Sequence, residues 1–317
     1  MNQIGTRKDT SKRYVTKAQI SIWQTPLVYY VFMGDINMSL TLTNVQQIEF
    51  DAMVKAEYRS RGFILRDSVM TRTDVIGAFV QFRKVGQVIA NAVGFQNTVA
   101  IQDPGFTALT ATLQKYAAGT AVDEIQDLTV NFSSKQELAM VVAMAIGRRS
   151  DQIIIDALVA GPGQTIVNGG TNLSYAKLRN VVQFFEENAV PLAERFFAMS
   201  GNNLRALLAA DQIISRFYTS NDAVATGTLM YRDLLGMNIR IIPTMTEGGL
   251  PIAANIRKTF AWHRMSTGMG IGQDLRTEIN YLPRETSWFV NGLFYAGAVI
   301  IDNRGVFQVD CDESVNP

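Results

Sequence analysis

Apolar residues recur along the chain at two spacings, one typical of helices and one typical of strands. From residue 136 to 159 they recur at intervals of three and four without a proline, which predicts a helix of about 25 residues. At 1.5 Å per residue this helix would be roughly 38 Å long, about twice the usual length, so we expect a structural axis. Ser134 and Glu137 have the spacing of a capping box, and Gly161 marks the expected end. The expected inward stripe is Leu138, Val141, Val142, Ala145, Ile146, Ile153, Ile154 and Leu158.

Three shorter segments also have helical patterns. The first is predicted at residues 44–59. The second, at 174–188, carries apolar residues at positions i, i+3, i+4 and i+7. The third begins near Asn203, which we assign as its N-cap, and continues to about residue 214.

Strand-like runs dominate residues 62–129. The runs 75–85 and 87–93 are separated by Gly86, which predicts a hairpin, and 107–116 predicts a further strand. A long hairpin with mixed faces is marginal in isolation, because it has little core of its own. We therefore expect it to lie against something else, such as another subunit.

The second half of the chain mixes helices and strands in no βαβ rhythm, so the predicted class is α+β. Residues 161–173 are rich in Gly, Asn and Thr and predict a loop. A turn is expected at 302–305 between the last two strands. The predicted strands are 195–200, 238–243, 258–265, 277–282, 292–301 and 305–311.

The composition excludes several classes of site in this chain of 317 residues. One Cys excludes an intrachain disulfide framework and a Cys-rich zinc site, and one His excludes a cluster of His ligands. Apolar residues make up 47% and charged residues only 18%, which permits a large core but leaves few charges for the surface. The start of the chain lacks the apolar core of a signal peptide, and the run near 138–146 is about half the roughly 20 residues that span a bilayer. We expect a chain made in a reducing cytosol, without a membrane partner.

The net charge of +1 hides an uneven distribution. Residues 1–20 carry five basic side chains against Asp9, or +4, which leaves about −3 for the rest of the chain. Two interpretations stay open for this tail: a solvated terminus, or an arm that lies near a polyanion or a neighbouring subunit. The basic side chains are Arg7, Lys8, Lys12, Arg13 and Lys17.

No group of residues has the spacing of a catalytic or cofactor site. The glycine-rich run 161–170 lacks the lysine of a phosphate-binding loop, and 268–272 lies outside any βαβ unit. A catalytic triad would have to use His263, but no nucleophile elbow accompanies it, so we interpret it as a half-buried strand residue. Cys311 has only acidic neighbours and is expected to be unreactive. We predict no metal and no cofactor, and interpret Asp302, Asp310, Asp312 and Glu313 as a solvated acidic end.

Taken in order, these elements resemble the major capsid proteins of tailed bacteriophages, which have the Hong Kong 97-type fold. The resemblance covers roughly residues 40–312 and lies in the order and spacing of five segments, none of them catalytic. Segment 79–87 resembles the family's extended loop, and 137–158, with Asp151 in its interior, resembles the long spine helix. The other three are 107–126, similar to the strand and acidic turn before that helix, 234–243, similar to a late axial-domain strand, and 297–309, similar to the last peripheral-domain strands.

The resemblance implies a domain organisation and a set of partners. Copies would form hexamers and pentamers of an icosahedral head around double-stranded DNA, with a separate scaffolding protein and a portal protein as partners. The protein would be made in the host cytoplasm and end in the virion. The implied divisions are an N-terminal arm (1–40), the start of a peripheral domain (41–61), the extended loop (62–106), the peripheral domain with the spine helix (107–160), an axial domain (161–255) and axial and peripheral return strands (256–317).

The residues expected to make contacts follow from these divisions. Some family members crosslink a Lys to an Asn, but no partner for Lys84 is identifiable, so that chemistry is not carried over. Two alternatives stay open, a non-viral compartment shell and a soluble enzyme that uses His263. Expected contacts between subunits are Phe79, Phe82, Arg83 and Lys84, and expected arm contacts to neighbours or DNA are Arg7, Lys8, Lys12 and Arg13.

Overall fold

The structure is a computed structural model, which describes residues 62–129, 134–209 and 234–315. The chain divides into two units, one of residues 1–57 with 123–134 and one of 58–122 with 135–317. In the first unit the structure describes the short helix α4 (Glu124–Thr129). The carboxylate of Asp123 accepts the N–H of Ile125 at its start. The helix predicted at 44–59 lies outside the described residues.

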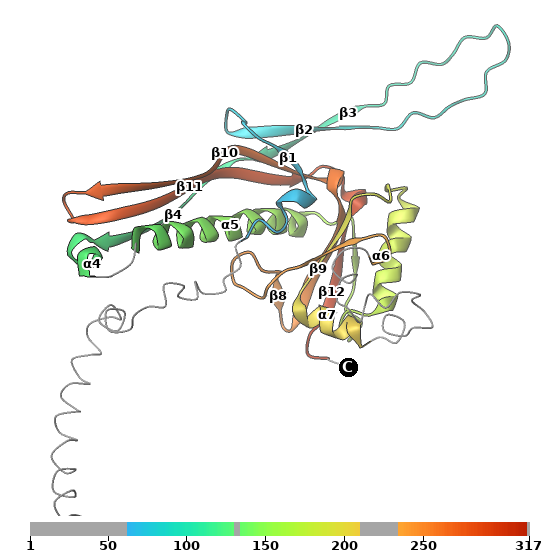
Figure 1. Cartoon of the computed structure of the whole chain (residues 1–317). Coiled ribbons are helices and arrows are strands. Elements are labelled where there is room, and N and C mark those ends of the chain that lie inside the picture. Colours follow the sequence, from blue (N-terminus) through green and yellow to red (C-terminus); the bar gives the residue numbers. More distant parts are fainter. Residues whose placement is uncertain (1–61, 130–133, 210–233, 316–317) are drawn as a thin grey trace, which may run out of the picture. The chain divides into compact units, whose positions relative to one another are not determined.

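The second unit contains a four-stranded sheet in the order β1-β10-β11-β4 (Figure 1). Strands β10 and β11 form a long antiparallel hairpin whose register runs from Thr267↔Ile300 to Leu282↔Ser287, with irregularities between Ile271 and Arg276. The strands predicted at 277–282 and 292–301 are therefore parts of longer strands. The bounds are β1 (Met70–Arg72), β4 (Gln114–Asp123), β10 (Thr267–Leu282) and β11 (Ser287–Ile300).

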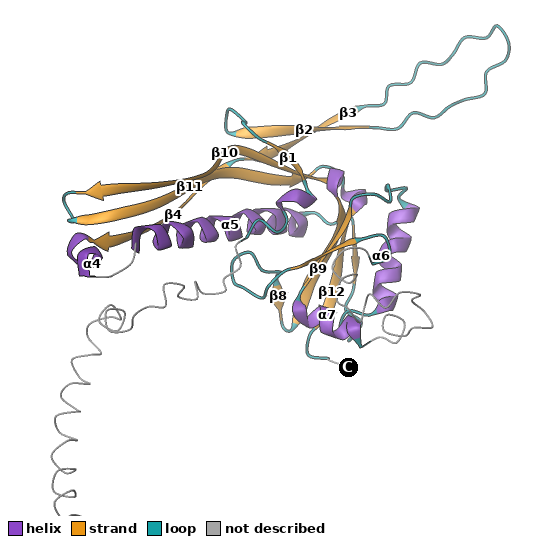
Figure 2. Ribbon diagram, viewed as in Figure 1, coloured by secondary structure: helices purple, strands orange, loops and turns teal. Residues whose placement is uncertain are grey.

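A second sheet has the order β5-β12-β9-β6-β7, with β8 paired to β9 (Figure 2). Helices α6 (Tyr175–Glu187) and α7 (Gly201–Leu208) accompany this sheet. Phe185 of α6 packs edge-on against Phe307 of β12, with 4.8 Å between the ring centroids. The strands are β5 (Gln164–Ile166), β6 (Arg195–Met199), β7 (Asn238–Ile241), β8 (Ile252–Ala253), β9 (Ile256–His263) and β12 (Val306–Asp312).

Helix α5 (Ser134–Ala160) confirms the predicted long helix and lies along the four-stranded sheet (Figure 1). Ile146 and Ile154 belong to the same core as Phe294 of β11, so the helix and the sheet share one apolar interior. Ser134 is the first helical residue rather than a residue before the helix. Val141 was expected to face inward but is 42% exposed, because the buried stripe passes through Val142 instead.

Asp151 joins α5 to the chain that leads into the first sheet. Its carboxylate accepts the backbone N–H groups of Ile64 and Leu65, at 3.1 and 3.0 Å. The side chain is buried, and this burial raises its pKa from 3.8 to about 6, although the two hydrogen bonds act in the opposite direction. The short 3-10 helix η1 (Arg66–Ser68) and strand β1 follow directly.

Side-chain caps define the starts of α6 and α7. Ser174 caps α6, so the helix predicted from residue 174 begins one residue later, at Tyr175. Ser200 caps α7, and Asn203 is the third residue of a capping box, so the assignment of Asn203 as the N-cap was wrong. Helix α7 ends at Leu208, whereas the prediction continued to 214, and 210–214 lie outside the described residues.

The third sheet is the two-stranded hairpin of β2 (Phe79–Val85) and β3 (Phe106–Thr112). The prediction of a return strand at 87–93 is wrong. Strand β2 pairs with β3 instead, and residues 86–105 form the loop that connects them. The run predicted as one strand at 107–116 is divided between β3 and β4. Similarly, the loop predicted at 161–173 contains the short strand β5.

Glycines of β10 bring the hairpin close to the first sheet. Val80 and Phe82 of β2 are buried with Ala111 of β3 in a small core of their own. A Cβ added to Gly268 would lie 2.7 Å from the ring of Phe82, so only glycine leaves room for that ring. The base of the hairpin is therefore anchored within its own subunit.

We predict that Gly268→Ala loosens the base of the hairpin by about 1–3 kcal/mol, because the added methyl group overpacks the site of Phe82. Native-state hydrogen exchange of the β2 and β3 amides measures this opening free energy. Gly201→Ala is the matched control, since a Cβ there meets nothing within 4 Å. Unchanged protection in Gly268→Ala would contradict the packing.

We predict a pH-dependent effect of Asp151→Asn on unfolding in urea. The pKa of about 6 in the folded protein exceeds the ordinary 3.8, so this group favours folding below about pH 4 and loses that contribution as the pH rises through 6. The stability of Asp151→Asn relative to the natural protein should therefore rise between pH 4 and 7, as measured by tryptophan fluorescence. Asp151→Ala should be less stable at both pH values, because two buried N–H groups lose their acceptor. A pH-independent difference for Asp151→Asn would contradict the raised pKa.

Candidate functional site

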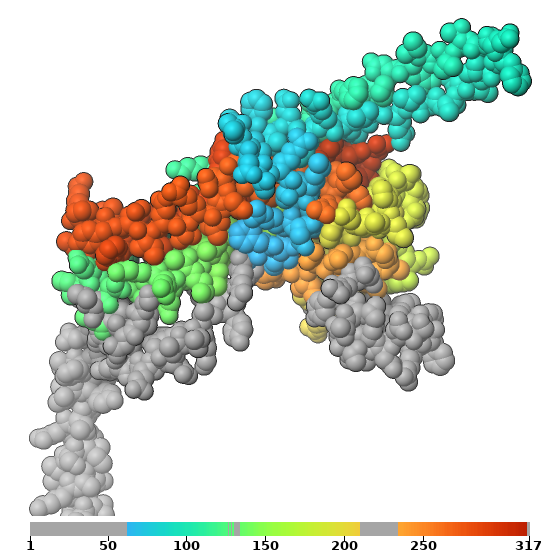
Figure 3. Space-filling view, turned by 45° about the horizontal axis from the view of Figure 1, so that its top comes forward, coloured from blue at the N-terminus to red at the C-terminus, as the bar shows by residue number. Residues whose placement is uncertain are grey.

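Exposed apolar side chains concentrate on the β2–β3 hairpin and its loop. Among the described residues, ten of the twenty exposed large hydrophobic side chains lie between Ile76 and Phe106. Phe95 and Ile101 are fully exposed. Figure 3 shows the loop as a narrow arm that extends beyond the sheets of its unit. The ten are Ile76, Phe79, Val85, Val88, Ile89, Val93, Phe95, Val99, Ile101 and Phe106.

The loop between the strands is almost free of charge. Asp103 is the one charged residue in 86–105. An exposed surface of apolar and uncharged polar side chains loses little favourable hydration when another protein covers it. Contiguous exposed apolar surface is typical of a protein interaction site, so this loop is the strongest candidate contact surface among the described residues.

The four residues expected to contact a neighbouring subunit have different surroundings. Phe79 and Arg83 are exposed and point away from the core of the hairpin. Phe82 is 1% exposed, and the guanidinium of Arg72 lies 4.9 Å from its ring centroid. Its ring fills a site within its own subunit, so the structure assigns Phe82 to the anchor of the hairpin and not to an outer surface.

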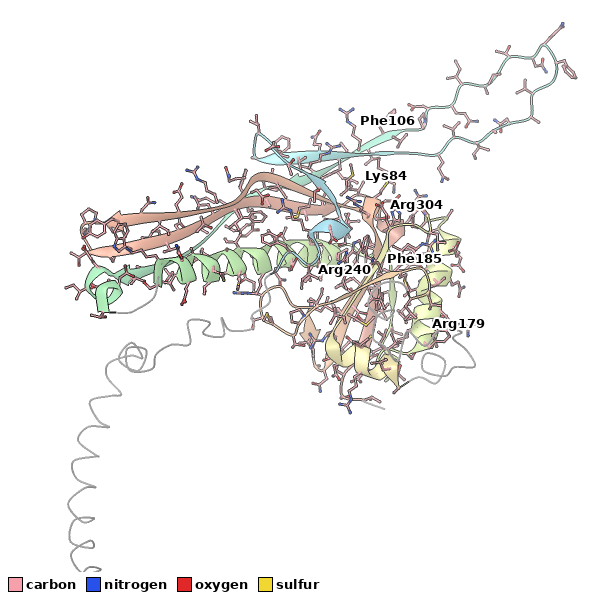
Figure 4. All side chains as sticks on the ribbon, viewed as in Figure 1. Lys84, Phe106, Arg179, Phe185, Arg240 and Arg304 are labelled. Carbon is pink, nitrogen blue, oxygen red and sulfur yellow. The ribbon has the colours of Figure 1, made fainter. Side chains whose placement is uncertain are left out.

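Lys84 connects the hairpin to the turn before β12 (Figure 4). Its Nζ lies 2.8 Å from Oδ1 of Asp302, and the guanidinium of Arg304 approaches Oδ2 of the same carboxylate at 2.9 Å. Partial burial would raise the pKa of Asp302, but hydrogen bonds from Arg304 and Lys84 outweigh it and lower the pKa to about 2. Asp302 is thus a charged anchor and not part of a solvated acidic end.

A groove lies beside this anchor, with a volume of about 500 Å³. Lys84 and Leu109 line it from the hairpin, Ala157 and Ala160 from the end of α5, and Ile300 from the end of β11. The groove is thus lined by small and apolar side chains next to a paired charge. It lies on the side of the unit where the hairpin begins.

Glu313 also departs from the expectation of a solvated acidic end. Its carboxylate forms a nearly buried ion pair with Arg257, at 2.6 Å between Oε1 and Nε, and also accepts the hydroxyl of Ser200. These contacts fasten the end of β12 to the start of α7. The sequence carried no signal for the pair, because the partners lie 56 residues apart. The carboxylate of Asp312, in contrast, belongs to a half-buried residue and accepts the N–H of Ser314 at 3.0 Å.

His263 and Cys311 occupy structural positions. His263 is buried at the end of β9, where its Nδ1 accepts the N–H of Met265 at 3.2 Å. Burial lowers the pKa of His263, which favours the neutral ring. Burial raises the pKa of the Cys311 thiol to about 11, so the thiolate is disfavoured and the residue is a poor nucleophile.

The described residues contain no group of three or more His, Cys, Asp or Glu side chains that could hold a metal ion. Nor does the described part of the chain include a helix of sufficient length and hydropathy to cross a membrane. The basic residues expected to contact neighbours or DNA lie outside the described residues. They are Arg7, Lys8, Lys12 and Arg13.

A family model described as phage capsid protein matches residues 42–313. No curated protein sequence matches the chain. The match to the family model spans both sheets, the hairpin with its loop, and the long helix, so it covers every element described above.

Solved structures from phages, including two phage capsids, have the same fold at low sequence identity. The structure from Mycobacterium phage Che8 is 16% identical, with a TM-score of 0.58 over 75% of this chain and 86% of that one. The capsid structure of cyanophage P-SCSP1u is 13% identical, with a TM-score of 0.63 over 80% and 88%. The capsid of Ralstonia phage GP4 is 9% identical, with a TM-score of 0.58 over 77% and 87%. The α+β arrangement of several sheets is thus one that phage capsid structures share.

We predict that Asp302→Asn removes a pH dependence from the base of the hairpin. The pKa of about 2 lies below the ordinary 3.8, so the anchor stabilises the fold above about pH 4 and is lost as the pH falls towards 2. Protection of the β2 amides, corrected for intrinsic exchange rates, should therefore fall between pH 5 and 2.5 in the natural protein.

The same protection should change little with pH in Asp302→Asn. The variant Lys84→Met should resemble Asp302→Asn at pH 5, because either change breaks the pair that connects β2 to the turn. If protection in the natural protein is the same at both pH values, the anchor does not hold the hairpin.

Proposed function

The chain belongs to the phage capsid protein family, and from that premise we propose that its copies form the hexamers and pentamers of an icosahedral head around double-stranded DNA. Proteins of this family are structural shell components, so the alternative of an enzyme that uses His263 is set aside. The match is to phage capsids, which favours a virion head over a non-viral compartment shell.

The observation that carries the proposal is the contrast between the two ends of the β2–β3 hairpin. Its base is buried on β10 through Phe82, whereas its loop exposes Phe95 and Ile101. A single subunit offers no described surface that covers the loop. A second copy that covered it would bury apolar area without burying more than one charge per loop. Repeated around a closed ring, such contacts give cooperative assembly from interfaces of ordinary size.

Under this proposal the elements take the parts of a Hong Kong 97-type subunit. The β2–β3 hairpin with its loop would form the extended loop (62–106), and α5 would form the spine helix of the peripheral domain (107–160). Helices α6 and α7 with the second sheet would form the axial domain (161–255), which would meet its copies around local symmetry axes. Strands β9 and β12 of that sheet come from the return segment (256–317), so the axial sheet is completed by the end of the chain.

The remaining partners follow from the same proposal. The basic residues of the arm (1–40) would contact neighbouring subunits or phosphates of the packaged DNA, without reading its sequence. A scaffolding protein would direct assembly, and a portal protein would occupy one vertex of the head. The subunits would be made in the host cytoplasm and end in the virion.

We predict that Phe95→Asp combined with Ile101→Asp abolishes shell formation and leaves the subunit folded. Both side chains are fully exposed in the subunit, so their replacement removes no internal packing. Two carboxylates in an apolar contact between copies would have to lose their hydration. Sedimentation and electron microscopy of the expressed protein, with its scaffolding protein present, measure the outcome.

The matched control is Phe95→Leu combined with Ile101→Val, which keeps the positions apolar and should assemble. Tryptophan fluorescence of both double variants checks that the subunit is folded. Shells formed by the Asp variant as readily as by the natural protein would contradict the proposed role of the loop.

A further inference from the structure

The loop between β2 and β3 has the dimensions of a continued hairpin. The ladder ends at Val85↔Phe106, and Gly86 donates its N–H to the carbonyl of Gly105 at 3.0 Å just beyond it. At the tip, Asn97 donates its N–H to the carbonyl of Gly94 at 3.2 Å. Gly94 follows Gly86 by eight residues and Asn97 precedes Gly105 by eight, so the two arms have equal length.

The turn at the tip is also in phase with the strands. In an antiparallel ladder only alternate residue pairs exchange backbone hydrogen bonds. Three residue pairs are bonded in the structure, and each lies an even number of residues from the next along both arms. One uninterrupted ladder from β2 to the tip would therefore include all three as bonded pairs. The pairs are Ala78 with Leu113, Gly86 with Gly105 and Gly94 with Asn97.

The residues around the arms suit such a ladder. Pro104 would lie opposite Gln87 at a non-bonded position, where the missing N–H of proline costs no hydrogen bond. In the structure Gln96 has a φ of 62° at the third position of the tip turn, as in a type II turn. Two-residue hairpins favour type I′ or II′ turns, so closing the ladder would include a change of turn type at the tip. Gly86 has no room for a Cβ beside the carbonyl of Pro104, so glycine is needed where the ladder would continue.

The two arms are nevertheless apart in the structure, and one side chain bridges the gap between them. The amide of Gln102 accepts the N–H of Ile89 at 2.9 Å and donates to the carbonyl of Ile89 at 3.0 Å. The arms enclose an opening of about 750 Å³. In a continued ladder Ile89 and Gln102 would form a non-bonded pair, whose backbone groups point away from each other. The contact between Gln102 and Ile89 and the closed ladder therefore exclude each other.

Closing the ladder would sort the side chains of the loop onto two faces. Alternation places one set of apolar residues, followed towards the base by Asp103, on the face that Val80 and Phe82 occupy in β2. It places Gln87, Asn91, Thr98 and Gln102 on the other face, together with Ile89 and Val93. The buried face of the hairpin base would thus continue along the loop as an apolar strip. The strip consists of Val88, Ala90, Ala92, Val99 and Ile101.

We propose that the loop has two forms, an open form held by Gln102 and a closed ladder whose apolar strip packs on a second copy of this chain. The inference rests on the proposed function for its partner, because a phage capsid subunit meets copies of itself. Contact with that copy favours closure, since backbone groups removed from water need the partners that only the ladder supplies. The open form belongs to the free subunit.

Cysteine pairs across the arms test the two forms. Ala92 and Val99 lie opposite each other in the closed ladder, where paired Cα atoms are about 5.5 Å apart and within reach of a disulfide. Ala92 and Ile101 are diagonal, roughly 7–8 Å apart, and serve as the mismatched control. The one native cysteine, Cys311, is buried and its pKa is raised, so it does not interfere.

In the free subunit, Gln102→Ala should accelerate disulfide formation in Ala92→Cys/Val99→Cys by about tenfold, because two hydrogen bonds of the open form are lost. The diagonal pair should stay slow with or without this change. Mass spectrometry of the linked peptides measures both rates. Equal rates for the two pairs, or no effect of Gln102→Ala, would overturn the two-form proposal.

In assembled shells that retain Gln102, the Ala92→Cys/Val99→Cys pair should crosslink faster than in the free subunit. Shells whose loops crosslink no faster would overturn the role of the second copy. If the natural protein forms no shells, the proposed function fails, while the comparison in the free subunit still decides whether the ladder exists.

Discussion

The packing of the β2–β3 hairpin onto the glycines of β10 is the constraint on which the rest of the subunit depends. Gly268 leaves room for the ring of Phe82, and this contact fixes the base of an otherwise marginal hairpin. Lys84, on the same face of β2 as Phe82, adds a charged anchor to Asp302. With its base fixed, the hairpin can present an exposed loop at a defined place without unfolding the sheet beneath it. The apolar residues of the loop can then serve contacts between subunits.

Much of the fold was predictable because long elements carry strong periodicity. Helices α5 and α6 were predicted from apolar spacing, and for α5 also from capping residues. The hairpin was predicted with the wrong partner, since residues 87–93 have the composition of a strand but β2 pairs with β3. Gly86 looked like the turn, whereas the turn lies at the tip of the loop. The pairing of β2 with β3 was not visible in the sequence, because residues 86–105 separate the two strands.

The candidate site was predictable only in part, for related reasons. Exposure of Phe79 and burial of Phe82 follow from strand alternation, but which face meets β10 is a tertiary fact. Likewise, the pairs of Asp302 with Lys84 and of Glu313 with Arg257 join residues far apart in sequence, so the sequence suggested a solvated acidic end. Composition, in contrast, limited the possible catalytic sites in advance, because the chain has one His and one Cys.

The central claim is that the loop of one subunit is covered by the next subunit in a closed shell. Electron cryomicroscopy of the assembled product tests this claim most directly. Our account predicts closed icosahedral particles in which residues 86–105 of each subunit lie against a neighbouring copy, with Phe95 and Ile101 buried. Closed particles in which this loop faces solvent on all sides would contradict the account.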